Sequence, residues 1–194
     1  MTRPSGTPRV IVDDDADRAA IERYRHGDRE AFAELVIRYQ RPIYNAAFWI
    51  LRRAEDANDV TQDVFLKVAE RLDEYDAQHK FFSWIYRIAV NEALNLLRRN
   101  GREEPLGDDV DLPDTERHGP ERMVADAELA SRIRSALMRM SVNDRVVLTL
   151  RHFSECSYEE IGQILGVDEK TVKSRLFEAR QRLRALLSDL GPDR

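Results

Sequence analysis

Hydrophobic residues recur every three or four positions along most of the chain, which is the spacing of one face of an α-helix. In the N-terminal half the pattern runs in four stripes, interrupted by Pro42 and by the stretch 74–80. The stripes comprise Phe32, Leu35, Val36 and Tyr39; Ile43, Ala46, Ala47 and Ile50; Val60, Val64, Phe65, Val68 and Leu72; and Ile85, Ile88, Ala89 and Leu96. Strand-like alternation does not occur in this half, so the sequence predicts an all-α fold.

The stretch 157–187 predicts two helices joined by a tight turn. Ser157 and Glu160 have the spacing of a capping box, which marks the start of the first helix. Gly166 can adopt the left-handed conformation that ends this helix, and Asp168 can cap the next one. The second helix has an inward stripe of Val172, Leu176, Ala179 and Leu183. This order is typical of a helix–turn–helix.

The outer face of this second helix is basic, with six Lys or Arg residues between Lys170 and Arg184. Such a face can serve only to keep a helix solvated. However, Thr171 and Ser174 are short and polar, and residues of that kind allow a backbone to approach DNA phosphates closely. Together with the paired caps and the glycine turn, they favour a helix that reads the DNA major groove.

Acidic and basic residues are concentrated in different parts of the chain. The 194 residues carry a net charge of −5, and the segment 101–125 alone holds three Arg against eight Asp or Glu. Because glycine and proline recur there, this segment predicts an acidic, flexible linker between two helical domains. The predicted boundaries are a disordered N-terminal tail at 1–19, a first domain at 20–100, the linker at 101–125 and a second domain at 126–190.

Several classes of protein are disfavoured by composition. No apolar run approaches the roughly 20 residues of a membrane span, so we expect no membrane insertion. Cys156 is the single cysteine, which excludes an intrachain disulfide and makes a reducing cytoplasm the expected location. The acidic stretch 55–63 contains no His or Cys, so it does not indicate a metal or acid–base site. We therefore expect no metal, no cofactor and no enzymatic activity.

Two clusters of residues leave alternatives open. Asp56, Asp59 and Asp63 share one helical face, where like charges repel one another. Either a cationic partner offsets this repulsion, or the face is a solvated helix start that the helix dipole favours. The stretch 81–86 has four aromatic residues, which cannot all point into the core from one helix. One or two should be exposed, and they either stack unpaired bases or pack against neighbouring helices.

The order of these motifs resembles that of bacterial extracytoplasmic-function sigma factors of the sigma-E-like kind. The resemblance covers roughly residues 20–188. Residues 23–47 resemble the first helices of the family, 56–72 the polymerase-binding helix, 81–99 the promoter-melting helix and 141–187 the C-terminal DNA-reading domain. Four motifs in this order are far more specific than any one of them.

The resemblance implies a role for each cluster. The polymerase-binding residues would be Asp56, Asp59, Gln62 and Asp63, with Asn58 standing where relatives usually have an acid. The residues that recognise and melt the downstream (−10) promoter element would be Asp76, Ala77, Gln78, His79, Lys80, Phe82, Trp84, Tyr86, Arg87 and Asn91. The residues that read the upstream (−35) element would be Lys170, Thr171, Lys173, Ser174, Arg175, Phe177 and Arg180.

The implied partners are core RNA polymerase, through the clamp helices of its largest subunit and its flap, and promoter DNA. Many relatives are also held inactive by an anti-sigma factor. Two other functions are compatible with the pattern of helices. One is an ordinary helix–turn–helix regulator with a helical sensor domain, which would need a ligand pocket in its first domain. The other is a helical scaffold that binds only proteins, which the basic helix at 170–184 disfavours.

Overall fold

The computed structural model describes residues 13–101 and 131–189, and all secondary structure within these two ranges is helical. The all-α prediction is therefore confirmed. The first range contains α1 (Asp14–Arg25), α2 (Glu30–Leu51), α3 (Ala54–Arg71), the short 3-10 helix η1 (Leu72–Glu74) and α4 (Phe81–Arg99). The second contains a helix over 131–138, α6 (Val142–Leu148), the π-helical turn η2 (Thr149–Phe153), α7 (Tyr158–Leu165) and α8 (Glu169–Asp189).

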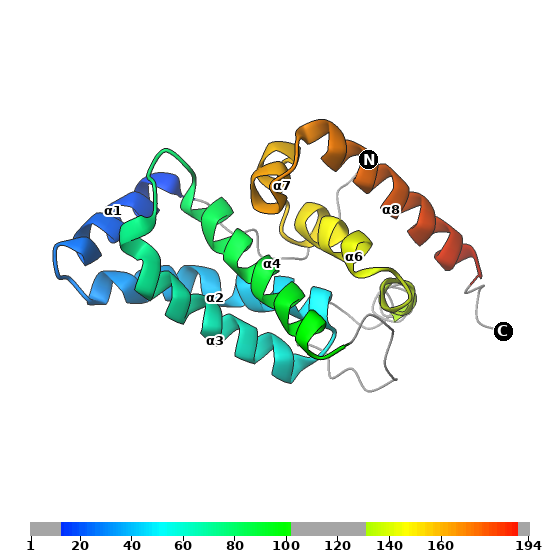
Figure 1. Ribbon diagram of the computed structural model, residues 1–194, viewed down its shortest axis with the longest axis horizontal. Helices are drawn as coiled ribbons and strands as arrows, with labels where there is room; N and C mark the ends of the chain where they lie inside the picture. Colours follow the sequence, from blue (N-terminus) through cyan, green and yellow to red (C-terminus); the bar gives the residue numbers. More distant parts are fainter. Residues whose placement is uncertain (1–12, 102–130, 190–194) are drawn as a thin grey trace, which may run out of the picture.

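Helices α1 to α4 form a bundle around the predicted apolar stripes (Figure 1). Leu35, Tyr39 and Ile43 of α2 are fully buried. Pro42 lies between them inside one continuous helix, so the predicted interruption at this residue is wrong. A proline removes one backbone hydrogen bond. The buried stripe continues on both sides of Pro42, and its packing keeps the helix intact.

The first domain begins earlier than the predicted boundary at residue 20. Helix α1 starts at Asp14, and the side chain of Asp13 accepts a hydrogen bond from the backbone of Ala16 at 3.0 Å. Asp17 is fully buried, where it accepts hydrogen bonds from Tyr39 and Arg38 of α2. Burial raises the pKa of Asp17, although both of these hydrogen bonds act to lower it. Residues 14–19 are thus part of the bundle, and residues 1–12 lie outside the described residues.

The helix–turn–helix forms as its end signals predict. Ser157 and Glu160 make both hydrogen bonds of the capping box, at 3.1 and 2.8 Å. Gly166 ends α7 in the left-handed region with φ of +66°. A second glycine, Gly162, allows the close approach of the turn, because a Cβ there would lie 2.8 Å from the carbonyl oxygen of Val167. The turn therefore fixes α8 firmly against α7.

The two helical domains pack against each other along α4 and the end of α2 (Figure 1). Helix α7 lies on α4, while η2 and α6 contact α2. Helix α8 packs on α6 and α7 at the outer side of the second domain. The segment expected as a linker lies outside the described residues from position 102 onward. None of the helices in the described ranges is long and apolar enough to cross a membrane.

Candidate nucleic-acid interface

Helix α8 presents the predicted basic face to solvent. The inward residues Val172, Leu176 and Ala179 are buried, so the intervening positions point outward. Asp168 caps the helix by accepting a hydrogen bond from the backbone of Thr171 at 2.6 Å. The exposed candidates are Lys170, Lys173, Ser174, Arg175 and Phe177, while Thr171 and Arg180 are half-buried. The seven residues proposed from the sequence therefore lie along one side of one helix.

Within the chain, Lys173 and Arg180 make only weak contacts, so most of their positive charge remains available to bind DNA. Lys173 pairs with Glu169 one turn away at 2.8 Å, and both side chains are more than half exposed. Exposed pairs of this kind are worth only about 0–1 kcal/mol, so an incoming phosphate can replace the carboxylate. Arg180 lies 3.4 Å from the Nε2 atom of His152. Burial is the main factor that lowers the pKa of His152, which favours a neutral ring that accepts from Arg180.

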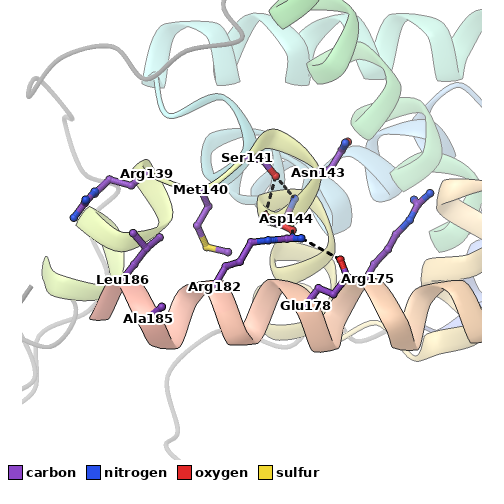
Figure 2. Close-up of a pocket in the computed structure, with 10 residues that line it drawn as sticks. All are labelled: Arg139, Met140, Ser141, Asn143, Asp144, Arg175, Glu178, Arg182, Ala185 and Leu186. Carbon is purple, nitrogen blue, oxygen red and sulfur yellow. Dashed lines mark hydrogen bonds and ion pairs between the residues drawn. The ribbon is translucent and has the colours of Figure 1, made fainter. Parts of the chain in front are cut away.

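A groove of about 790 Å³ runs between α8 and α6 and continues to the end of the helix 131–138 (Figure 2). Arg182 lies in the middle of this groove, where it contacts Asp144 at 2.6 Å and Glu178 at 3.0 Å. Arg175 and Arg139 lie at its two ends. The paired Arg182 stabilises the packing of α8 on α6, whereas Arg139 extends the basic surface beyond α8.

Helix α3 presents an exposed polar face opposite its buried one. Val60 and Val64 pack into the bundle, and Asp59, Gln62 and Asp63 point to solvent. Asp56 differs from them because it is half-buried and lies 3.9 Å from Arg53. The structure thus brings three of the four predicted polymerase-binding residues together as an exposed patch.

The loop 76–80 between η1 and α4 is exposed but internally braced. The side chain of Asp76 accepts a hydrogen bond from the backbone of Gln78 at 2.9 Å, and the hydroxyl of Tyr75 donates to the carbonyl of His79 at 2.5 Å. Arg25 of α1 donates to the carbonyl oxygens of Leu72 and Tyr75. A loop held in this way presents its side chains in a fixed geometry, which suits capture of an unstacked base.

The aromatic residues at the start of α4 differ from the sequence expectation that one or two are exposed. Phe81 packs against Tyr39 in the bundle, and Trp84 is half-buried against Phe81. Phe82 and Tyr86 are each only 1% exposed, with ring centroids 4.4 Å apart. The expectation fails because Phe81 and Trp84 pack against rings of the first domain, while the hydroxyl of Tyr86 lies beside Ser154 of the second domain. Arg87 and Asn91 remain exposed at the edge of the covered surface.

Sequence reasoning missed several surface residues that belong with these patches. Leu66 is 62% exposed, and it lies one turn after Gln62 and Asp63 on the same side of α3. Its position was detectable, because it falls four residues after Gln62 and seven after Asp59. Arg139 and Asn143 also line the groove beside α8. They lie outside that helix, and no spacing in the sequence indicates that they belong to its basic surface. Among the described residues, no group of three or more His, Cys, Asp or Glu side chains is placed to hold a metal ion.

Comparison with known families assigns both domains. Residues 35–103 match the model of Sigma-70 region 2, and residues 130–183 match the model of Sigma-70 region 4. The first match covers α3, the loop 76–80 and α4. The second covers the helix–turn–helix and most of α8. Each cluster of candidate residues therefore falls inside a matched region.

Individual relatives give the same result over most of the chain. The RNA polymerase sigma-H factor of Pseudomonas aeruginosa is 32% identical over 93% of this chain and 98% of its own length. The ECF RNA polymerase sigma-E factor of Escherichia coli strain K12 is 34% identical over 85% of this chain and 91% of its own length. A solved structure of CnrH in complex with the cytosolic domain of CnrY is 30% identical, covers 90% of this chain and 99% of that chain, and has a TM-score of 0.69. The chain belongs to the extracytoplasmic-function sigma factors of the Sigma-70 family.

Proposed function

We propose that this sigma factor binds core RNA polymerase in the cytoplasm, directs it to promoters and helps to open the DNA strands there. The observation that carries the proposal is the combination, in one chain, of an exposed acidic face on α3 and a basic recognition helix, α8. A regulator that only binds duplex DNA needs the second surface but not the first. The groove beside α8 does not favour a ligand sensor in the first domain, because all the residues that line it belong to the second domain.

Polymerase binding is assigned to the exposed patch Asp59, Gln62 and Asp63. Its partner would be the basic clamp helices of the largest polymerase subunit, with the flap contacting the second domain. Complementary charge steers such encounters and fixes their orientation. Asp56 has a secondary role in this proposal, since it already lies close to Arg53 within the chain.

Reading of the upstream promoter element is assigned to α8. Its N-terminal half would enter the major groove, where arginine side chains can form paired hydrogen bonds with guanine. Arg175 and Lys173 are the exposed candidates for such contacts, and Phe177 can make apolar contact with a thymine methyl group. Arg180, held beside His152, is better placed to bind a phosphate.

Capture of the melted strand is assigned to the loop 76–80 and to the adjoining face of α4. Lys80 and Arg87 would bind the phosphates. Phe82, Trp84 and Tyr86 would stack with unpaired bases, Phe82 and Tyr86 only once their rings, each 1% exposed, are uncovered. Base–aromatic stacking is worth about 1–3 kcal/mol per base, which is enough to offset unstacking in a weakly paired duplex. Trp84 is the most exposed of the three rings, although it also packs on Tyr75 and Phe81.

Permanganate footprinting with core polymerase tests this assignment. The complex should expose thymines of the non-template strand near the start site, and the Tyr86→Ala variant should form closed complexes that open poorly. A pre-melted promoter bubble should restore part of the lost activity. The Ile88→Ala variant serves as a control, because Ile88 is half-buried in the same helix and has no assigned contact with DNA. If Tyr86→Ala opens promoters as the parent does, the ring has only a packing role and the melting assignment is wrong.

A further inference from the structure

We propose that a cavity between α4, α6 and α8, called the arginine cavity below, is a binding site for a phosphate dianion, either inorganic phosphate or the phosphate end of a small ester. Four polar side chains line it: Arg87 and Asn91 from α4, Asn143 from α6 and Arg175 from α8. We further propose that this ligand competes with promoter DNA. That second step rests on the proposed function, which assigns Arg87 and Arg175 to the two promoter elements.

The polar side chains of the arginine cavity are not engaged elsewhere in the described part of the chain. Within residues 13–101 and 131–189, no side-chain hydrogen bond or ion pair is formed by Arg87, Asn91, Asn143 or Arg175. Arg182 in the neighbouring groove differs, because it is paired with Asp144 at 2.6 Å. Each guanidinium has five N–H groups and each amide has two, so the cavity offers many donors to a ligand.

The charge of the arginine cavity favours an anion. Its described lining includes two arginines and no carboxylate. Like charges in one confined space repel each other, and a bound anion would offset this repulsion. A phosphate monoester carries about −1.5 to −2 charges at pH 7 and presents three acceptor oxygens. Guanidinium groups bind such oxygens in pairs, and the amide N–H groups can donate to the oxygen that remains.

The size and the walls of the arginine cavity suit a small ion. Its volume is about 200 Å³. This is several times the roughly 30 Å³ that a water molecule occupies, but it is below the range of about 300–1,000 Å³ for drug-sized ligands. Val90, Val147 and Ile164 are buried beside the cavity and form an apolar wall. Apolar surroundings strengthen the attraction between opposite charges. The cavity therefore fits a phosphate group rather than a whole nucleotide.

A phosphate bound in this cavity would engage a residue from each DNA-binding set. Arg87 belongs to the face of α4 assigned to the melted strand, and Arg175 belongs to the helix assigned to the upstream element. Arg175 and Asn143 lie at the same end of the groove beside α8, away from Arg139 (Figure 2). Because one guanidinium cannot hold a free phosphate and a DNA contact at the same time, phosphate should weaken DNA binding beyond the effect of ionic strength.

Asn143→Asp tests the site, because it adds a negative charge to the cavity with almost no change in shape. Asn143 has no assigned contact with DNA, and an acid near the start of a helix is compatible with the helix dipole. Asn91→Asp makes the same change from α4. The matched control is Asn58→Asp, at an exposed position of α3 that does not line the cavity. Binding of inorganic phosphate to the full chain is measured by the broadening of its ³¹P NMR signal, at constant ionic strength maintained with chloride.

Asn143→Asp and Asn91→Asp should each weaken phosphate binding about tenfold or more, because a like charge inside the site repels the ligand. Asn58→Asp should bind phosphate as the parent does. Glycerol phosphate, titrated in the same way, identifies the source of the ligand: tighter binding than that of inorganic phosphate indicates an ester, and weaker binding indicates the free ion. Absence of binding to the parent, or equal binding by the parent and both cavity variants, would overturn the site.

Fluorescence anisotropy tests the competition, with a duplex of a promoter that the chain transcribes with core polymerase. When phosphate reaches about nine times its own Kd, about a tenth of the molecules keep the site empty, so duplex affinity should fall about tenfold relative to chloride at the same ionic strength. Asn143→Asp should remove this difference between the two salts. Equal duplex affinity of the parent in both salts would overturn the competition. If the parent does not bind the duplex even in chloride, promoter reading fails instead, and the phosphate titration alone decides whether the site exists.

Discussion

Reversal of charge on the exposed face of α3 should weaken binding to core polymerase strongly while leaving the fold intact. The test variant carries Asp59→Lys and Asp63→Lys. Each carboxylate at a partly solvated contact contributes about 1 kcal/mol, and reversal replaces that attraction with repulsion of similar size. Two positions therefore give about 4 kcal/mol. Since 1.4 kcal/mol corresponds to a tenfold change, affinity should fall roughly several hundredfold or more.

The helix itself should tolerate this change. Asp59 and Asp63 are four residues apart, and two lysines at these positions repel each other about as much as two aspartates do. Helix α3 is held in the bundle by its buried side, where Ala57, Val60 and Val64 are unaffected. Circular dichroism should therefore show the same helix content in the variant as in the parent.

Competition for labelled core polymerase is the appropriate assay, with the Asp15→Lys/Glu30→Lys variant as control. The control changes the net charge equally at two exposed positions on α1 and α2. It should compete like the parent, and the affinity lost by the test variant should diminish at high salt because surface charges are screened. Equal competition by the test variant and the parent would refute the docking assignment. Equal losses in both variants would show that net charge matters rather than the α3 face.

Three further predictions concern the other parts of the chain. Alanine at Lys173, Arg175 and Arg180 of α8 should flatten the salt dependence of promoter binding by about one per lost phosphate contact, measured by anisotropy on promoter and random duplexes; unchanged recognition would reject the assignment of these three residues. Asp17→Ala should lower the free energy of unfolding by about 2–3 kcal/mol in urea denaturation, because it leaves the buried hydroxyl of Tyr39 unpaired. Limited proteolysis should cleave between residues 102 and 122 and leave two helical fragments that co-elute on gel filtration, because Trp49 contacts Phe153 and Arg145 donates to Ile50 across the two domains; a single fragment resistant across this stretch would contradict the two-domain organisation.

Local signals predicted the helix–turn–helix well because its determinants are close together in sequence. The capping box at Ser157, the left-handed Gly166 and the cap at Asp168 each act within three or four residues. The exposed face of α3 was predictable for the same reason, since the buried Val60 and Val64 fix the opposite side of the helix. The periodicity of hydrophobic residues is sufficient to predict the exposed face of a helix when the buried residues of that same helix fix its orientation.

Long-range packing limited the rest of the prediction. Pro42 suggested an interruption, but burial of the stripe on both sides of it outweighs one lost backbone hydrogen bond. The burial of Tyr86 could not be predicted, because its hydroxyl lies beside Ser154 of the other domain. Contacts such as Arg145 with Ile50 join residues 95 positions apart, and no spacing in the sequence indicates them.

Run-off transcription tests the central claim most directly. Purified core polymerase is incubated with a genomic promoter library, with and without the chain, and the transcripts are sequenced. We predict a defined set of start sites that appears only with the chain, shares an upstream and a downstream sequence element, and is lost with the Asp59→Lys/Asp63→Lys variant. Duplex binding by the chain together with a transcript pattern identical to that of core polymerase alone would contradict the claim that this sigma factor directs promoter-specific initiation.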